Sequence, residues 1–213
     1  MPDPDSELIK RNNEKMVKIK LCGLMRPEDI EAVNILKPEY IGFVFAPGSK
    51  RYIDPEQAAA FKNILDPEIR AVGVFVDARK ELVLKLLEDN VIDIAQLHGN
   101  EDDEYIDHIK NVSGKPVIKA FRISCSGDIP AVQQSRADYV LLDSGAGTGK
   151  VFNWDLIRSI KRPFFLAGGL DHENVRQAVN ELKPFAVDVS SGIEVNGIKD
   201  IGRMNAFVEA VRT

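Results

Sequence analysis

Short apolar runs rich in β-forming residues alternate with longer amphipathic stretches along the chain, and this alternation restricts the fold more than any other feature. Eight of the runs are predicted as strands, and their starts lie roughly 22 to 30 residues apart, about the length of one strand–helix unit. The predicted strands are residues 17–21, 40–45, 70–76, 92–97, 116–121, 139–142, 163–167 and 185–189. Most of them are apolar at consecutive positions, as expected for parallel strands that helices cover.

The stretches between the strands carry the start signals of helices. Pro27 and Pro55 suit the first turn of a helix, and acidic residues follow each of them, where the helix dipole favours negative charge. Capping residues stand before three later helices, in the segment Asn100–Asp103, at Asn153 and at Asp171. Residues 198–211 are predicted as a closing eighth helix.

Eight strands that each precede a helix predict a single-domain (β/α)8 barrel, the TIM barrel. An open doubly wound sheet is the alternative, although such sheets usually have fewer strands. Residues 16–213 contain no linker rich in Pro, Gly or Ser and are predicted to form this one domain. Residues 1–15 are polar, lack the apolar core of a secretory signal, and are predicted as a tail.

The composition excludes several classes of protein. The formal net charge of −5 argues against a nucleic-acid partner, which would require a basic patch. No apolar run approaches the ~18 residues of a membrane-spanning helix. Cys22 and Cys125 match no zinc-binding spacing, so no metal site is expected, and two free thiols favour the reducing cytoplasm. The oligomeric state stays open between a monomer and a homodimer.

Two residues at the ends of predicted strands are candidates for acid–base chemistry, because barrel active sites form where the strands end. Cys22 follows the first strand beside Gly23, and the alternative is a buried cysteine that only packs. Asp143 follows the sixth strand and is either a catalytic group or a cap. The loop 144–150 after it contains three glycines, is too long for a simple cap, and is predicted to close as a lid.

The loops after the last two strands are predicted to bind phosphate. Gly168 and Gly169 follow the seventh strand, and Ser190, Ser191 and Gly192 follow the eighth. Barrels often hold a phosphate between these two loops with backbone N–H groups, which glycine lets approach closely and serine hydroxyls supplement. Two ordinary tight turns are the alternative.

Two further side chains face the predicted barrel mouth. Arg51, in the loop after the second strand, has a planar fork that suits a substrate carboxylate, although most surface arginines are simply solvated. His98, after the fourth strand, could act as a general base by its type and is predicted as a residue of the substrate site; the alternative is a structural histidine that bonds to the barrel wall.

An ordered set of short motifs resembles the phosphoribosylanthranilate isomerase family of tryptophan biosynthesis. The motifs run from about residue 17 to the C-terminus, and the set is far more specific than any single member. They are Lys20–Gly23, Gly42–Phe45, Ser49–Tyr52, Gln96–Gly99, Leu142–Asp143, Gly147–Gly149, Ala167–Leu170 and Asp188–Glu194. Two features depart from the family pattern: the loop after Asp143 is compact, and Asn153 stands where an aspartate is common.

The resemblance implies a cofactor-free Amadori rearrangement of a phosphorylated aminosugar. It assigns Cys22 as the general base and Asp143 as the general acid, places Arg51 against the anthranilate carboxylate, and gives the two glycine- and serine-rich loops to the phosphate. The protonation states are a difficulty, because cysteine titrates near ~8.5 and aspartate near ~3.9. Inverting that order requires a combined shift of ~4.6 units, roughly 6 kcal/mol, so the active form is expected to be a minority state or to form with substrate.

Three rival functions are weaker. The histidine-pathway aminoaldose isomerase has a similar barrel, but it uses aspartate where Cys22 stands and a substrate with two phosphates. A lyase would require a lysine beyond an inner strand, whereas Lys119 lies within one. A barrel that binds a phosphorylated ligand without turnover is disfavoured by the pairing of Cys22 with Asp143.

Overall fold

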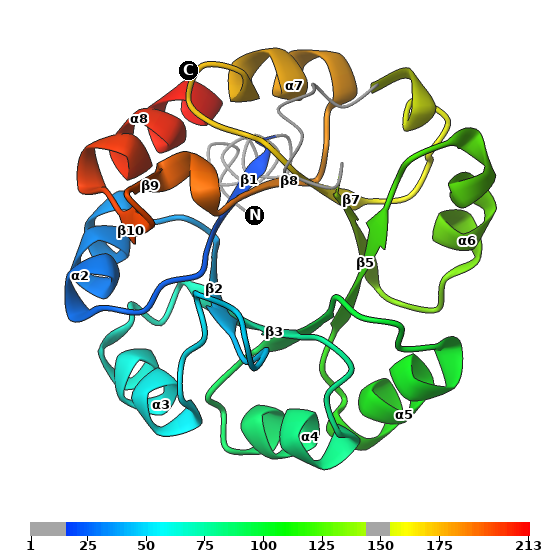
Figure 1. Cartoon of the computed structure of the whole chain (residues 1–213), viewed down its shortest axis with the longest axis horizontal. Coiled ribbons are helices and arrows are strands. Elements are labelled where there is room, and N and C mark those ends of the chain that lie inside the picture. The colour runs from blue at the N-terminus through cyan, green and yellow to red at the C-terminus, as the bar shows by residue number, and fades with distance from the viewer. Residues whose placement is uncertain (1–15, 144–153) are drawn as a thin grey trace, which may run out of the picture.

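Eight parallel strands close into a barrel with helices around it in the computed structural model, which describes residues 16–143 and 154–213 (Figure 1). The strands are β1 (Lys18–Cys22), β2 (Tyr40–Val44), β3 (Arg70–Phe75), β4 (Ile94–Leu97), β5 (Val117–Arg122), β6 (Tyr139–Asp143), β7 (Phe164–Ala167) and β8 (Ala186–Val189). Strand β1 pairs with both β2 and β8, so the sheet has no open edge. The predicted (β/α)8 barrel is confirmed, and the open sheet is excluded.

The outer layer consists of α2 (Pro27–Leu36), α3 (Pro55–Ile64), α4 (Lys80–Glu88), α5 (Asp103–Ser113), α6 (Ile129–Gln134), α7 (Val175–Leu182) and α8 (Ile201–Arg212). The starts of α2, α3 and α5 follow the predicted signals. Asp54 accepts a hydrogen bond from the N–H of Glu56 at the start of α3, and Asp102 accepts one from Tyr105 at the start of α5. These side chains satisfy N–H groups that have no partner within the helix.

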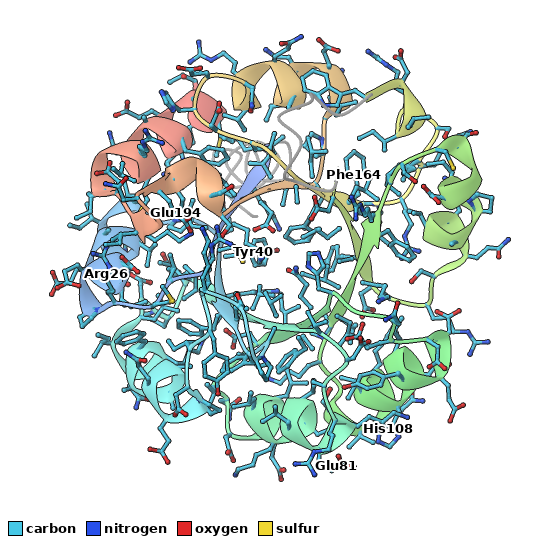
Figure 2. All side chains as sticks on the ribbon, viewed as in Figure 1. Arg26, Tyr40, Glu81, His108, Phe164 and Glu194 are labelled. Carbon is cyan, nitrogen blue, oxygen red and sulfur yellow. The ribbon has the colours of Figure 1, made fainter. Side chains whose placement is uncertain are left out.

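Two apolar layers hold the barrel together. Side chains that point outward from the strands pack under the helices, with Ile19 and Leu21 of β1 among them. Side chains that point inward fill the interior, and Tyr40 is one of them (Figure 2). The Phe165 ring meets the rings of Tyr40 and Tyr139 edge-on, at interplanar angles of 62° and 84°. Because side chains alternate along a strand, Lys18, Lys20 and Cys22 share one face of β1.

Several predicted boundaries are wrong by one or two residues, and three differences are larger. After β6 the described residues hold a short 3-10 helix, η2 (Trp154–Leu156), where an α-helix was expected. Asp171 does not cap α7 directly, because its carboxylate binds the N–H groups of Glu173 and Asn174 in the turn before it. The predicted last helix begins only at Ile201.

The residues before α8 instead form a small antiparallel hairpin of β9 (Glu194–Val195) and β10 (Ile198–Lys199). Asn196 and Gly197 form its turn with φ of 52° and 80°, values that Asn and Gly tolerate best. The predicted tail at residues 1–15, the predicted lid at 144–150 and the cap at Asn153 lie outside the described residues. Among the helices of the described ranges, none has the length and apolarity required to cross a membrane.

Candidate active site

Cys22 is the last residue of β1 and points into the mouth of the barrel. Its side chain packs against Val44, Ala46 and Val74, and it is 7% exposed. Gly42 pairs with it on β2, and a Cβ atom at Gly42 would lie 2.5 Å from the Cys22 sulfur. The thiol therefore occupies space that the glycine leaves open.

The charges around Cys22 oppose each other. Burial raises the pKa of the thiol, the nearby Lys20 and Lys199 ammonium groups lower it, and Asp188 raises it further. The net pKa lies above the ordinary value for cysteine. The thiol form is therefore favoured at neutral pH.

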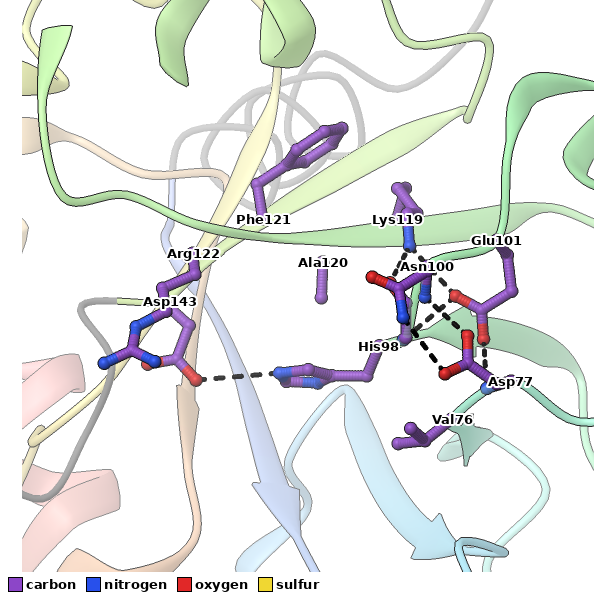
Figure 3. Close-up of a pocket in the computed structure, with 11 residues that line it drawn as sticks. Val76, Asp77, His98, Asn100, Glu101, Lys119, Ala120, Phe121, Arg122 and Asp143 are labelled. Carbon is purple, nitrogen blue, oxygen red and sulfur yellow. Dashed lines mark hydrogen bonds and ion pairs between the residues drawn. The ribbon is translucent and has the colours of Figure 1, made fainter. Parts of the chain in front are cut away.

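Asp143 ends β6 on the other side of the mouth and faces His98 of the loop after β4. The His98 Nε2 atom lies 3.6 Å from the Asp143 Oδ2 atom (Figure 3). Gln96 holds the other ring nitrogen, with its Nε2 atom 3.2 Å from His98 Nδ1. In the described part of the chain, the buried Oε1 atom of Gln96 has no hydrogen-bond partner. His98 is thus positioned by the barrel wall and also directed toward the candidate acid.

One cavity of ≈ 240 Å³ brings most of the predicted site residues together. Its lining includes Cys22, Arg51, His98, Asp143, Gly168, Gly169, Ser190 and Ser191. Gly192 does not line it. A Cβ atom at Gly192 would lie 2.0 Å from the carbonyl oxygen of Leu170, so this glycine allows the loops after β7 and β8 to meet.

Both glycines of the loop after β7 have left-handed backbone conformations, which favour glycine. Gly168 and Gly169 both have positive φ, 89° and 68°. Ser190 donates a hydrogen bond from its hydroxyl to the Cys22 carbonyl, which ties β8 to β1. Lys199 of β10, only 5% exposed, donates to the Ser190 carbonyl oxygen over 2.8 Å. A buried ammonium beside this loop adds positive potential where an anion is expected.

Arg51 is held by a partner that sequence reasoning missed. Its Nε and Nη2 atoms donate to the two carboxylate oxygens of Glu194 over 2.6 and 3.0 Å. Lys199 donates to the same carboxylate over 2.8 Å. Burial alone would raise the pKa of Glu194, but the hydrogen bonds from Arg51 and Lys199 lower it to about 2. The Asn196–Gly197 turn was the signal that could have placed both Glu194 and Lys199 in a hairpin.

A larger cavity of ≈ 770 Å³ adjoins the first and shares His98 and Asp143 with it (Figure 3). Lys119 of β5 lies in its wall and donates to the Gly99 carbonyl over 2.6 Å and to the Glu101 carboxylate over 2.9 Å. Glu101 in turn accepts from the N–H groups of Asp77 and Gly99. Lys119 is therefore engaged in fixing two loops, which agrees with the rejection of a lyase. Within the described ranges, no cluster of His, Cys, Asp or Glu could hold a metal ion.

Comparisons with known proteins identify the family to which this geometry is similar. The family model described as N-(5'phosphoribosyl)anthranilate (PRA) isomerase matches residues 19–210. A relative from Endomicrobium trichonymphae, named N-(5'-phosphoribosyl)anthranilate isomerase, is 46% identical over 203 residues, which cover 93% of this chain and 100% of the relative.

Solved structures agree. Phosphoribosyl anthranilate isomerase from Thermotoga maritima has a TM-score of 0.85 and 38% identity, and the match covers 92% of this chain and 99% of that one. A further structure of such an isomerase, in complex with reduced 1-(o-carboxyphenylamino)-1-deoxyribulose 5-phosphate, has a TM-score of 0.82 and 37% identity with the same coverage. The Thermotoga maritima protein is described elsewhere as dimeric, with monomers generated from it.

Proposed function

The chain belongs to the N-(5'-phosphoribosyl)anthranilate isomerase family, and from this premise we propose that Cys22 is the general base and Asp143 the general acid of its reaction. The reaction is an Amadori rearrangement in tryptophan biosynthesis. N-(5-phosphoribosyl)anthranilate, an aminoaldose, becomes 1-(2-carboxyphenylamino)-1-deoxyribulose 5-phosphate, an aminoketose.

The acid acts first. Asp143 gives a proton to the ring oxygen of the ribose, and the ring opens to a cationic imine. The imine acidifies the C–H bond on the adjacent carbon. The Cys22 thiolate removes that proton, which leaves an enolamine, and tautomerisation gives the ketone. General acid–base steps of this kind contribute about 10²–10⁴-fold each.

The remaining groups hold the substrate in place. The loops that contain Gly168, Gly169, Ser190 and Ser191 bind the phosphate with backbone N–H and hydroxyl groups, and Gly192 allows those loops to meet. Arg51 presents the edge of its guanidinium that Glu194 does not use to the anthranilate carboxylate. When the phosphate and the anthranilate carboxylate of the substrate are both bound, its reacting carbons lie between the two catalytic side chains. Binding therefore orients the substrate for the reaction.

One observation carries this proposal: Cys22 of β1 and Asp143 of β6, which are far apart in the sequence, line the same cavity as both candidate phosphate loops. Family membership also favours this reaction over the histidine-pathway isomerase and over the lyase. In the former, the position of Cys22 would hold an aspartate.

The test is turnover of phosphoribosylanthranilate by the purified chain and two variants. Cys22→Ala and Asp143→Asn are each expected to lower kcat by about 10²-fold or more. Cys125→Ala, which changes an exposed thiol that does not line the cavity, is the matched control and should keep wild-type kinetics. Wild-type turnover in either site variant overturns the assigned role, and binding without turnover by the wild-type chain overturns the activity itself.

The cellular compartment, the oligomeric state and the bounds of the catalytic domain are also part of the proposal. Cys22 and Cys125 are both free, which supports the reducing cytoplasm as the compartment. A dimeric relative supports the homodimer among the two oligomeric states expected. Residues 16–213 are proposed as the single catalytic domain, with residues 1–15 as a tail outside it.

A further inference from the structure

A buried ion pair lies inside the barrel directly below Cys22. Lys20 is fully buried, and its Nζ atom lies 2.9 Å from the Asp188 Oδ1 atom. The two residues are paired across the β1–β8 seam that closes the barrel. Lys20 lies two residues before Cys22 on the same inward face of β1, so the two side chains are neighbours inside the barrel.

We propose that Lys20 is a positioning residue of the reaction, whose buried ammonium stabilises the Cys22 thiolate while Asp188 holds that ammonium in place. The inference rests on the proposed role of Cys22 as base. A thiol buried among apolar side chains stays protonated near neutral pH, whereas the proposed base must be a thiolate. A nearby cation explains how the thiolate can form.

The electrostatic reason is the low polarity of the interior. Removing Cys22 from water destabilises its anion, and a neighbouring cation offsets part of that loss. Although burial alone would lower the pKa of Lys20, Asp188 and Cys22 together raise it, so the lysine keeps its charge. Among the neighbouring charges that lower the pKa of the thiol, Lys20 has the largest effect.

Other charged groups also lie near the thiol, but they are paired with other residues than Lys20 is. Lys199 also lowers the pKa of Cys22, but its ammonium donates to Ser190 and Glu194. The other titratable side chains that line the cavity are Arg51, His98, Asp143 and Asp188. Of these, Arg51 is held by Glu194, and Asp188 opposes ionisation of the thiol. Of the two lysines, Lys20 lies on the same strand face as Cys22 and lowers the pKa of the thiol more than Lys199 does.

The proton balance is simple. The Cys22 thiol first releases its proton to water, and the resulting thiolate accepts the proton from the substrate carbon. Lys20 keeps all its protons throughout. Asp188 limits the stabilisation, because its negative charge favours the neutral thiol. The two members of the pair therefore act on the thiol in opposite directions.

This opposition gives a test that does not depend on activity. In a Cys125→Ser background, the rate of alkylation of Cys22 by iodoacetamide is measured against pH, and the midpoint reports the thiol pKa. Lys20→Met should raise the midpoint by about 1 unit or more. Asp188→Asn should lower it. Lys18→Met is the matched control, because Lys18 is on the same face of β1 but its ammonium lies over the Phe185 ring, and its midpoint should stay at the wild-type value.

A midpoint that is unchanged or lower in Lys20→Met overturns the proposal. So does a rise in Asp188→Asn, which would mean that the pair only holds local structure. If Lys20→Met does not fold, as judged by thermal melting, Asp188→Asn still decides the question. Turnover measured in parallel separates the base role of Cys22 from the effect of Lys20 on its pKa. Activity that survives Cys22→Ala would overturn the base role, whereas the shifts of the alkylation midpoint would still test the effect of Lys20.

Discussion

Arg51 and Glu194 are joined by two parallel hydrogen bonds, from Nε to Oε1 over 2.6 Å and from Nη2 to Oε2 over 3.0 Å. This side-on pairing fixes the plane of the guanidinium and leaves its other edge, which includes Nη1, for a second anion. Because Arg51 also lines the cavity that contains Cys22, the pair links the small hairpin before α8 to the candidate substrate site.

Glu194→Gln is expected to raise KM for phosphoribosylanthranilate about tenfold and to change kcat little. A charge-assisted pair contributes roughly 1.5–3 kcal/mol, and a substrate carboxylate is held equally before and during the reaction. Steady-state kinetics give both constants. Lys50→Ala is the control, because Lys50 is exposed and 3.6 Å from the same carboxylate, and it should change KM less than about twofold. A fall in KM would show that Glu194 competes with substrate.

The same carboxylate should make stability depend on pH in acid. Its pKa is lowered from 4.5 to about 2 in the folded chain, so the unfolded chain takes up a proton at a higher pH. The contribution to the free energy of unfolding is complete above about 4.5 and is lost as the pH falls toward about 2. Urea unfolding between pH 6 and pH 2.5 should show a smaller loss in Glu194→Gln. Glu31→Gln, in an exposed position on α2, should follow the wild type.

Gly192→Ala should weaken both stability and phosphate binding. The added Cβ atom would lie 2.0 Å from the Leu170 carbonyl oxygen, so the loops after β7 and β8 must separate. Overpacking of this kind costs about 1–3 kcal/mol. Thermal melting and the affinity for inorganic phosphate measure the two effects. Gly127→Ala, whose Cβ would meet only the Cys125 sulfur at an ordinary 3.4 Å, is the control and should change neither.

The sequence predicts the barrel and the placement of Cys22 and Asp143 for one reason. In a parallel barrel every strand ends at the same face, so a reactive side chain at a strand end is located once the strand is recognised. Strand spacing and helix caps are signals that a short stretch of sequence carries. Because eight strand–helix units show similar signals, together they predict the barrel more firmly than one unit would. The exact strand ends could not be set, because pairing rather than composition decides where a strand stops.

The charge pairs could not be predicted, because they join distant segments. Lys20 and Asp188 meet only through the register of the seam between β1 and β8, which no local pattern specifies. Lys199 was placed within a helix, because strands of two residues have no periodicity to detect. The Asn196–Gly197 turn did carry a hairpin signal, and with it Glu194 could have been placed beside Lys199.

Lys119→Met is expected to destabilise the fold by about 3–5 kcal/mol, because it leaves the Glu101 carboxylate buried without its cation. Glu101 accepts from two backbone N–H groups of the loops after β3 and β4, so those loops should lose order as well. Urea unfolding gives the change. The double variant Lys119→Met with Glu101→Gln should recover much of the loss, since no charge is then left unpaired. A single variant as stable as the wild type would contradict this account.

Gly42→Ala tests whether the position of the Cys22 sulfur matters for the reaction. Gly42 pairs with Cys22 across β1 and β2, and the new Cβ atom would lie 2.5 Å from the sulfur. The thiol must rotate away or the strands must separate. If the thiol is the base, kcat should fall about 10²-fold with a smaller change in KM, because a misplacement of about 1 Å is enough for such a loss.

Gly73→Ala is the control: its Cβ atom would meet Ile92 at 2.6 Å and would disturb packing away from the sulfur. It should lower the melting temperature with a smaller effect on kcat. Equal losses of kcat in both variants would show that packing, and not the place of the thiol, determines the rate.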